Sequence, residues 1–129
     1  MELVSLLEIG EWIWKHLRRK KILLAVEDEP ADAMHLREQL QVSKMRYVIA
    51  SSAEEAVGLL KSNRFDAALI DIGLPLMDGT ELAEKIRDEY PKMRVFFITG
   101  SSFISLKEST LLRIVRKPIT HKVLEEMVL

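Results

Sequence analysis

The chain contains five short apolar runs after residue 20, and stretches with helical periodicity lie between them. The runs are KILLAV (21–26), YVIA (47–50), DAALI (66–70), VFFI (95–98) and RIV (113–115). Several of them are continuously apolar rather than alternating, which is typical of β-strands covered on both faces. The repeated alternation of strand and helix predicts an α/β fold with a parallel sheet between two layers of helices, and right-handed crossovers leave few topologies for it.

Two of the intervening stretches have clear helical patterns. The stretch 52–63 places four apolar residues on one helical face: Ala53, Ala56, Val57 and Leu60. Its Ser52 and Glu55 have the spacing of a capping box. The stretch DGTELAEKIRDEY repeats this form, with Asp78 and Glu81 at the same spacing. Its predicted inward residues are Leu82, Ile86 and Tyr90.

The composition is that of an ordinary globular domain and excludes several classes of protein. The chain has 129 residues, 48% hydrophobic and 30% charged, and a formal net charge of -1. A charge near zero argues against a nucleic-acid binder. The chain has no cysteine, which excludes disulfides and thiolate metal sites, and a reducing cytoplasm is the expected location. No apolar run approaches the ~20 residues that span a bilayer, and the acidic N-terminus does not resemble a secretory signal.

Polar side chains follow four of the five predicted strands. In order along the chain they are Glu27 and Asp28, Asp71, Thr99 and Lys117. Ligands of open parallel sheets bind outside the carboxyl ends of the strands, so we expect these side chains to converge on one edge. An acidic residue after a strand is also a common turn former. The prediction therefore depends on the joint placement of all five residues.

The expected cluster suits a metal ion and a phosphoryl group. Carboxylates held a few Å apart repel each other, and a hard divalent cation such as Mg²⁺ (or Mn²⁺) removes that repulsion. Gly73 leaves a backbone carbonyl accessible as a further oxygen ligand. Lys117 and Thr99 suit the oxygens of a tetrahedral anion. Asp71 is the natural nucleophile, because carboxylates form acyl phosphates.

These segments together resemble a known family, the receiver domain of response regulators in two-component signalling. ILLAVEDEP is similar to its first strand and acidic pair, and ALIDIGLPLMDG to its phosphoacceptor strand and loop. FFITG and VRKPI resemble the strands that carry its hydroxyl and its lysine. The match covers residues 20–129. The resemblance implies a flavodoxin-like, three-layer α/β/α fold with five parallel strands in the order 2-1-3-4-5.

The resemblance also implies a role for each site residue. Asp71 would accept a phosphoryl group from a sensor histidine kinase or a histidine phosphotransfer protein. The implied magnesium ligands are Glu27, Asp28, Asp71 and the Gly73 backbone carbonyl. The implied phosphoryl-binding residues are Thr99 and Lys117. Such a domain hydrolyses its own acyl phosphate, and a downstream protein partner reads the surface around its fourth and fifth strands. No turnover of a separate substrate is expected.

Three features depart from the family pattern. Ile114 stands three places before the lysine, where the family has an aromatic residue that reports phosphorylation by rotating. The segment between Thr99 and Lys117 is short by roughly one helical turn. The final segment, PITHKVLEEMVL, has room for only about two or three turns of helix. All three departures are expected on one side of the molecule.

Residues 1–19 are an extension ahead of the predicted receiver domain of residues 20–129. A stripe of residues at spacings of four and three predicts an amphipathic helix: Leu3, Leu7, Gly10, Trp14 and Leu17. Early acids and late bases complement its dipole. The helix could dock on its own domain or pair with a second copy to form a homodimer. A membrane-surface role fits less well, because the acids weaken attraction to anionic lipid.

The sequence leaves three candidate functions for the protein. The first is a stand-alone receiver that acts as a phosphorylated switch or relay, and Met1 with no trailing linker predicts a complete chain. The second is an adaptor that works through its N-terminal helix independently of phosphate. The third is a magnesium-dependent phosphatase with an aspartyl nucleophile. This third function is disfavoured, since Gly73 stands where a general acid is needed and no segment is long enough to form a cap.

Overall fold

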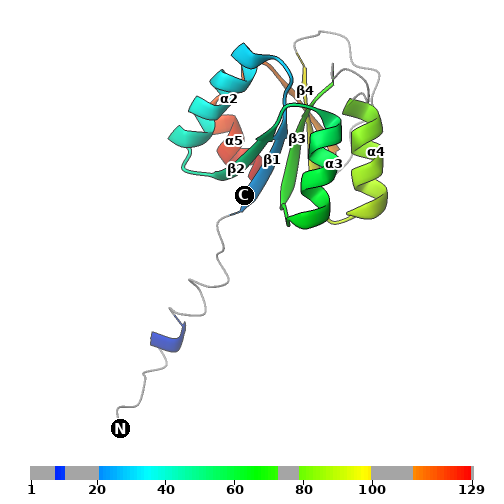
Figure 1. The fold of residues 1–129 in the computed structure, drawn as a ribbon. Helices are drawn as coiled ribbons and strands as arrows, with labels where there is room; N and C mark the ends of the chain where they lie inside the picture. The colour runs from blue at the N-terminus through cyan, green and yellow to red at the C-terminus, as the bar shows by residue number, and fades with distance from the viewer. Residues whose placement is uncertain (1–7, 11–20, 73–78, 100–111, 129) are drawn as a thin grey trace.

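The computed structural model describes residues 8–10, 21–72, 79–99 and 112–128 (Figure 1). It contains a five-stranded sheet of the order β2-β1-β3-β4-β5, and all neighbouring strands run parallel. The strands are β1 (Ile22–Val26), β2 (Arg46–Ala50), β3 (Ala67–Asp71), β4 (Arg94–Thr99) and β5 (Leu112–Arg116). This topology confirms the predicted fold, and each strand matches a predicted run to within one residue at either end.

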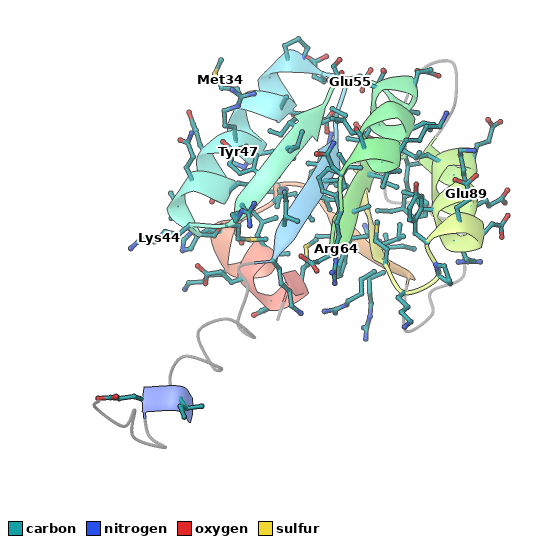
Figure 2. The ribbon with its side chains drawn as sticks, turned by 60° about the horizontal axis from the view of Figure 1, so that its bottom comes forward. Met34, Lys44, Tyr47, Glu55, Arg64 and Glu89 are labelled. Carbon is teal, nitrogen blue, oxygen red and sulfur yellow. The ribbon has the colours of Figure 1, made fainter. Side chains whose placement is uncertain are left out.

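Helices cover both faces of this sheet. They are α2 (Pro30–Val42), α3 (Ala53–Ser62), α4 (Gly79–Glu89) and α5 (His121–Val128). Figure 1 shows α2 and α5 on one face and α3 and α4 on the other. The labelled side chains of Met34 and Glu89 extend outward from α2 and α4 (Figure 2). Among the described residues, no helix is both long and apolar enough to cross a membrane.

The core consists of two apolar layers that share the sheet. In β1, Leu24 and Val26 belong to the layer under α3 and α4, whereas Leu23 and Ala25 belong to the layer under α2 and α5. All four residues have no exposed surface. Since both faces of the strand are covered, an apolar residue is favoured at every position. This is why the runs are continuous rather than alternating.

The predicted start of α3 is confirmed in part, whereas Asp78, the predicted cap of α4, lies outside the described residues. The Ser52 hydroxyl accepts a hydrogen bond from the Glu55 backbone N–H at 3.1 Å, so Ser52 caps α3. The Glu55 carboxylate bonds Ser51 rather than closing on Ser52, accepting from the Ser51 N–H at 3.0 Å and its hydroxyl at 2.7 Å. In α4, Leu82 and Ile86 are fully buried as predicted. The Tyr90 hydroxyl donates to the Leu60 carbonyl.

The atypical segments are described only in part. Helix α5 has 8 residues, in agreement with the short final helix that the sequence predicts. The expected stunted helix between β4 and β5 falls in residues 100–111, outside the described residues. Of the predicted N-terminal helix, residues 8–10 are described and are helical. The division into an extension of residues 1–19 and a domain of residues 20–129 stays a prediction.

Candidate functional site

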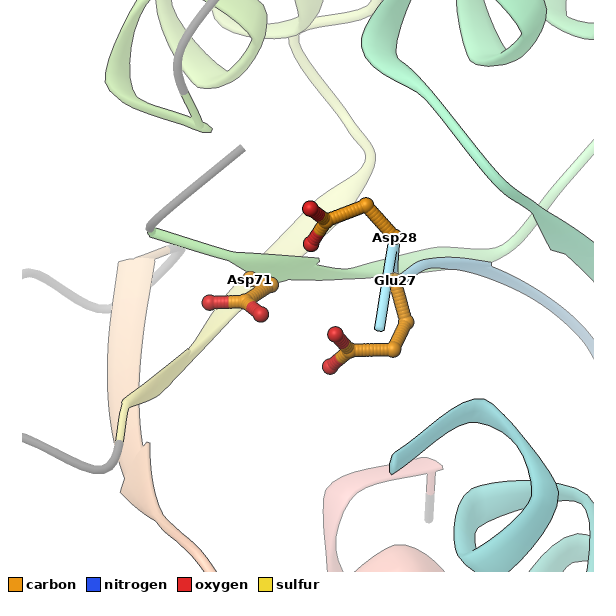
Figure 3. Close-up of side chains that lie close together, drawn as sticks. All are labelled: Glu27, Asp28 and Asp71. Carbon is orange, nitrogen blue, oxygen red and sulfur yellow. The ribbon is translucent and has the colours of Figure 1, made fainter. Parts of the chain in front are cut away.

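Three carboxylates lie together at the carboxyl end of the sheet. Glu27 and Asp28 directly follow β1, and Asp71 is the last residue of β3. These strands are neighbours, with Val26 opposite Ile70. One carboxylate oxygen from each of the three acids lies within 4.8 Å of the others, and Figure 3 shows the side chains turned toward one another. The predicted convergence of the acids is therefore present.

The two adjacent acids occupy different environments. Glu27 is 2% exposed, whereas Asp28 is exposed. Burial removes water from the Glu27 carboxylate and, with a hydrogen bond to Asp71, raises its pKa to about 7. The Glu29 backbone N–H, which donates to Glu27 Oε1 at 3.2 Å, acts in the opposite direction. Near neutral pH, the Glu27 carboxyl is therefore only partly ionised.

Lys117 supplies the positive charge of the site. It follows β5, and its Nζ lies 3.2 Å from Glu27 Oε2 and 3.4 Å from Asp71 Oδ2. Its shortest contact, 2.6 Å, is with Asp32 Oδ2. Burial, the largest influence, lowers the Lys117 pKa, but the Asp32 hydrogen bond and the Glu27 and Asp71 charges outweigh it and leave the pKa above its ordinary value. Lys117 is therefore an ammonium at any physiological pH.

The other two predicted residues are described incompletely. Thr99 ends β4, and its backbone lies opposite Arg116, which precedes Lys117. This places Thr99 at the same edge of the sheet as the acids, while its side chain lies outside the described part. Gly73 also lies outside the described residues. Its expected carbonyl ligand and the Thr99 hydroxyl therefore stay predictions.

Asp32 is a site residue that the sequence analysis missed. It lies in the first turn of α2, and the structure pairs it with Lys117, 85 residues away. One signal was present: a helix that begins directly after a strand has its first turn at the carboxyl edge of the sheet. An acid four residues after Asp28 could therefore have been included among the candidates.

Gly79 is a second missed residue, and it acts through its lack of a side chain. It is buried at the start of α4. A Cβ atom there would lie 2.5 Å from the Asp71 carbonyl oxygen and 3.0 Å from the Ile72 Cα. Only glycine lets α4 begin this close to the end of β3. Gly79 lies in the quoted phosphoacceptor segment, but its role depends on a backbone contact that the sequence does not show.

The donor set fits a hard divalent cation. All three clustered side chains offer carboxylate oxygens, the ligands that Mg²⁺ accepts together with water. Among the described residues, Lys117 faces three carboxylates, and burial together with the neighbouring Asp71 keeps Glu27 partly protonated near neutral pH. A cation would remove the need for that proton. The residues present therefore suit magnesium, and Glu27, Asp28 and Asp71 could each supply it with an oxygen ligand.

Comparison with known proteins identifies relatives of the chain. A family model, the response regulator receiver domain, matches residues 23–129. A response regulator receiver protein of Anaeromyxobacter sp. (strain Fw109-5) is 32% identical over 100 residues, which cover 74% of this chain and 42% of that protein. The chain thus spans less than half of this relative's length.

Solved structures agree with this match. A CheY-like receiver domain protein from Methanospirillum hungatei JF-1 is 31% identical, with a TM-score of 0.72 over 84% of this chain and 90% of that one. The response regulator TrrA from Thermotoga maritima, solved with Mg²⁺ and BeF, is 30% identical, with a TM-score of 0.73 over 82% of this chain and 94% of that one. TrrA has also been solved in complex with the histidine kinase ThkA. Since the family model covers most of the chain, this protein belongs to the response regulator receiver domain family of two-component systems.

Proposed function

We propose that the protein is a phosphorylation-dependent switch or relay in which Asp71 accepts a phosphoryl group. The observation that carries this proposal is the position of Asp71: it ends a buried strand, its side chain is 14% exposed, and it lies 3.4 Å from the Lys117 ammonium. A carboxylate in this position is accessible to a phosphodonor and has a cation beside it. The neighbouring carboxylates of Glu27 and Asp28 complete a site for magnesium.

The proposed transfer uses the carboxylate as nucleophile. An Asp71 carboxylate oxygen attacks the phosphorus of a phosphohistidine, the phosphorus–nitrogen bond breaks, and the electron pair leaves with the imidazole. Lys117 pairs with a phosphoryl oxygen, and the Thr99 hydroxyl donates to another. Glu27, Asp28, Asp71 and the Gly73 carbonyl would hold magnesium, which would supply charge neutralisation at the phosphoryl oxygens. Attack of water on phosphorus then breaks the bond between phosphorus and the Asp71 oxygen, which releases inorganic phosphate and the free carboxylate.

The proposed phosphodonor is a sensor histidine kinase or a histidine phosphotransfer protein. This is supported by the similarity to TrrA, which forms a complex with a histidine kinase. A downstream protein partner would read the phosphorylated state. A homodimer through the N-terminal helix and a location in the cytoplasm stay predictions, as does the stand-alone action of the chain.

A small phosphodonor tests the proposal. Incubation with acetyl phosphate and Mg²⁺ should add one phosphoryl group, detected by intact mass, that is acid-stable and lost on treatment with hydroxylamine. Asp71→Asn should abolish the adduct, because an amide is a poor nucleophile, while Asp66→Asn at the opposite edge of the sheet should retain it. An unmodified wild-type protein under these conditions would contradict the proposed function.

A second candidate is a phosphate-independent adaptor with the same fold. Ile114 favours it: this residue is partly buried in β5 and packs against the α3–α4 layer of the core, where an aliphatic side chain cannot rotate a ring between buried and exposed positions. Partner binding and oligomeric state, measured with and without beryllofluoride, separate the two functions. A change on addition supports the switch, and no change supports the adaptor.

A further inference from the structure

Helix α2 contacts the segment that follows β5 through three polar side chains. Asp32 accepts from Lys117 Nζ at 2.6 Å, His35 Nε2 donates to the Ile119 carbonyl at 2.9 Å, and Gln39 Oε1 accepts from the His121 N–H at 2.9 Å. Because these α2 residues are spaced by three and four, they lie on one face of the helix. The position of Lys117 is therefore set partly from α2, outside the three-carboxylate cluster.

The contacts of the Lys117 ammonium are unequal. Its distance to Asp32 is 2.6 Å, compared with 3.2 Å to Glu27 and 3.4 Å to Asp71. The Asp32 side chain is 45% exposed, whereas those of Glu27 and Asp71 are 1% and 14% exposed. Asp32 thus holds the ammonium from the solvent side of the site. The shortest hydrogen bond of Lys117 therefore goes to Asp32, which is neither the proposed nucleophile nor a predicted metal ligand.

This arrangement leaves Lys117 room to move. A cavity of about 350 Å³ lies beside it, and its lining includes Asp32, His35 and Lys117. The Lys117 side chain is 24% exposed. A flexible lysine stem next to open space can reorient without displacing packed core residues.

We propose that Asp32 is a positioning residue that holds Lys117 in the unphosphorylated state and competes with the phosphoryl group for it. The proposal rests on the proposed function, in which Lys117 pairs with a phosphoryl oxygen. Before that pairing forms, the ammonium must leave Asp32 or share its protons with both groups. Asp32 thereby reduces the fraction of molecules in which Lys117 is free to bind the phosphoryl group. Its removal should make the site bind phosphoryl groups more readily.

Asp32→Asn tests this competition. We expect the affinity for beryllofluoride and the initial rate of phosphorylation by acetyl phosphate to rise by roughly fivefold, the effect of losing one partly exposed ion pair. Asp32→Glu keeps the charge and should stay near wild type. Glu38→Gln removes an equal charge from an exposed position on the same helix, so it should change neither quantity. Equal values for Asp32→Asn and wild type, or a weaker response in Asp32→Asn, would overturn the proposal.

A second measurement examines Lys117 without any phosphodonor. In ¹⁵N-labelled protein, Asp32→Asn should shift the Lys117 Nζ resonance and speed exchange of its ammonium protons with water by at least about threefold, while Glu38→Gln leaves both unchanged. If wild-type protein accepts neither phosphate nor beryllofluoride, the proposed function fails, and this measurement alone decides whether Asp32 holds Lys117. An unchanged Lys117 signal in Asp32→Asn would overturn the positioning role.

Discussion

At the scale of single residues, the site separates side chains of the same chemical type by environment. Glu27 and Asp28 are adjacent acids, but one is buried and the other exposed. Burial raises the pKa of Glu27 to about 7, so this carboxyl is only partly ionised near neutral pH. The pKa of Lys117 is also set by burial and by the acidic side chains beside it. Lys117 is the ammonium that balances Asp32, Glu27 and Asp71.

Lys117→Gln should destabilise the protein at neutral pH in the absence of divalent cations. Loss of the ammonium leaves three carboxylates without their shared positive partner, and we expect the free energy of unfolding to fall by about 1 kcal/mol, a modest value because Lys117 and its nearest partner Asp32 are partly exposed. Urea denaturation at pH 7 measures the change. Lys122→Gln removes the same charge from an exposed position in α5 and should be neutral to within about 0.5 kcal/mol. Equal stability of the two variants would contradict this role of Lys117.

At the scale of elements, the sequence predicts best where one local pattern decides the outcome. All five strands were predicted to within one residue, and in β1, β3 and β4 burial on both faces accounts for the continuous apolar runs. Helix α2 has a weaker pattern, since it buries Leu36 and Leu40 but exposes Met34 and Val42. Its contact between Asp32 and Lys117 joins residues 85 positions apart, and no local pattern encodes such a pair.

Two glycine-to-alanine substitutions are expected to have opposite effects on the free energy of unfolding. Gly79→Ala should lower the free energy of unfolding by about 1–3 kcal/mol, because its Cβ would lie 2.5 Å from the Asp71 carbonyl oxygen and must push α4 away from β3. Gly58→Ala is the matched control: a Cβ at this exposed position in α3 meets nothing within 4 Å. It should stabilise the protein by about 0.5–1 kcal/mol. Thermal and urea unfolding measure both variants, and a neutral Gly79→Ala would show that the close approach of α4 is not required.

At the scale of the whole molecule, net charge conceals the electrostatics of the site. The chain has a formal net charge of -1, yet the carboxyl edge of the sheet brings Glu27, Asp28 and Asp71 together, and Lys117 contacts Glu27, Asp71 and Asp32 there. The fold concentrates this charge because parallel strands end at the same edge. Residue types and strand order allowed three of the acids to be predicted together, whereas their unequal burial required coordinates. Because the acids are unequally buried, the free energy of unfolding of the whole protein depends on pH.

The free energy of unfolding should fall as pH rises from about 5 to 8 when no divalent cation is present. Glu27 has a pKa of about 7 in the folded protein and an ordinary value of 4.5, so between these values the folded state binds more protons than the unfolded state. Its contribution is therefore fully present below about pH 4.5 and is lost as pH rises through 7, by up to about 3 kcal/mol. Chemical denaturation across this range, in the presence of a chelator, measures the loss.

Glu27→Gln isolates this effect, because every other ionisable side chain is present in both proteins. The variant should show a flatter profile and should exceed wild type in stability at pH 8 without metal. Adding Mg²⁺ at pH 8 should stabilise wild type, since the cation replaces the proton that balances the carboxylates, and should stabilise Glu27→Gln less. If the difference in unfolding free energy between the two proteins is the same at pH 5 and pH 8, the buried carboxyl of Glu27 does not govern the pH response, and the crowding of acids at this edge of the sheet is relieved in another way.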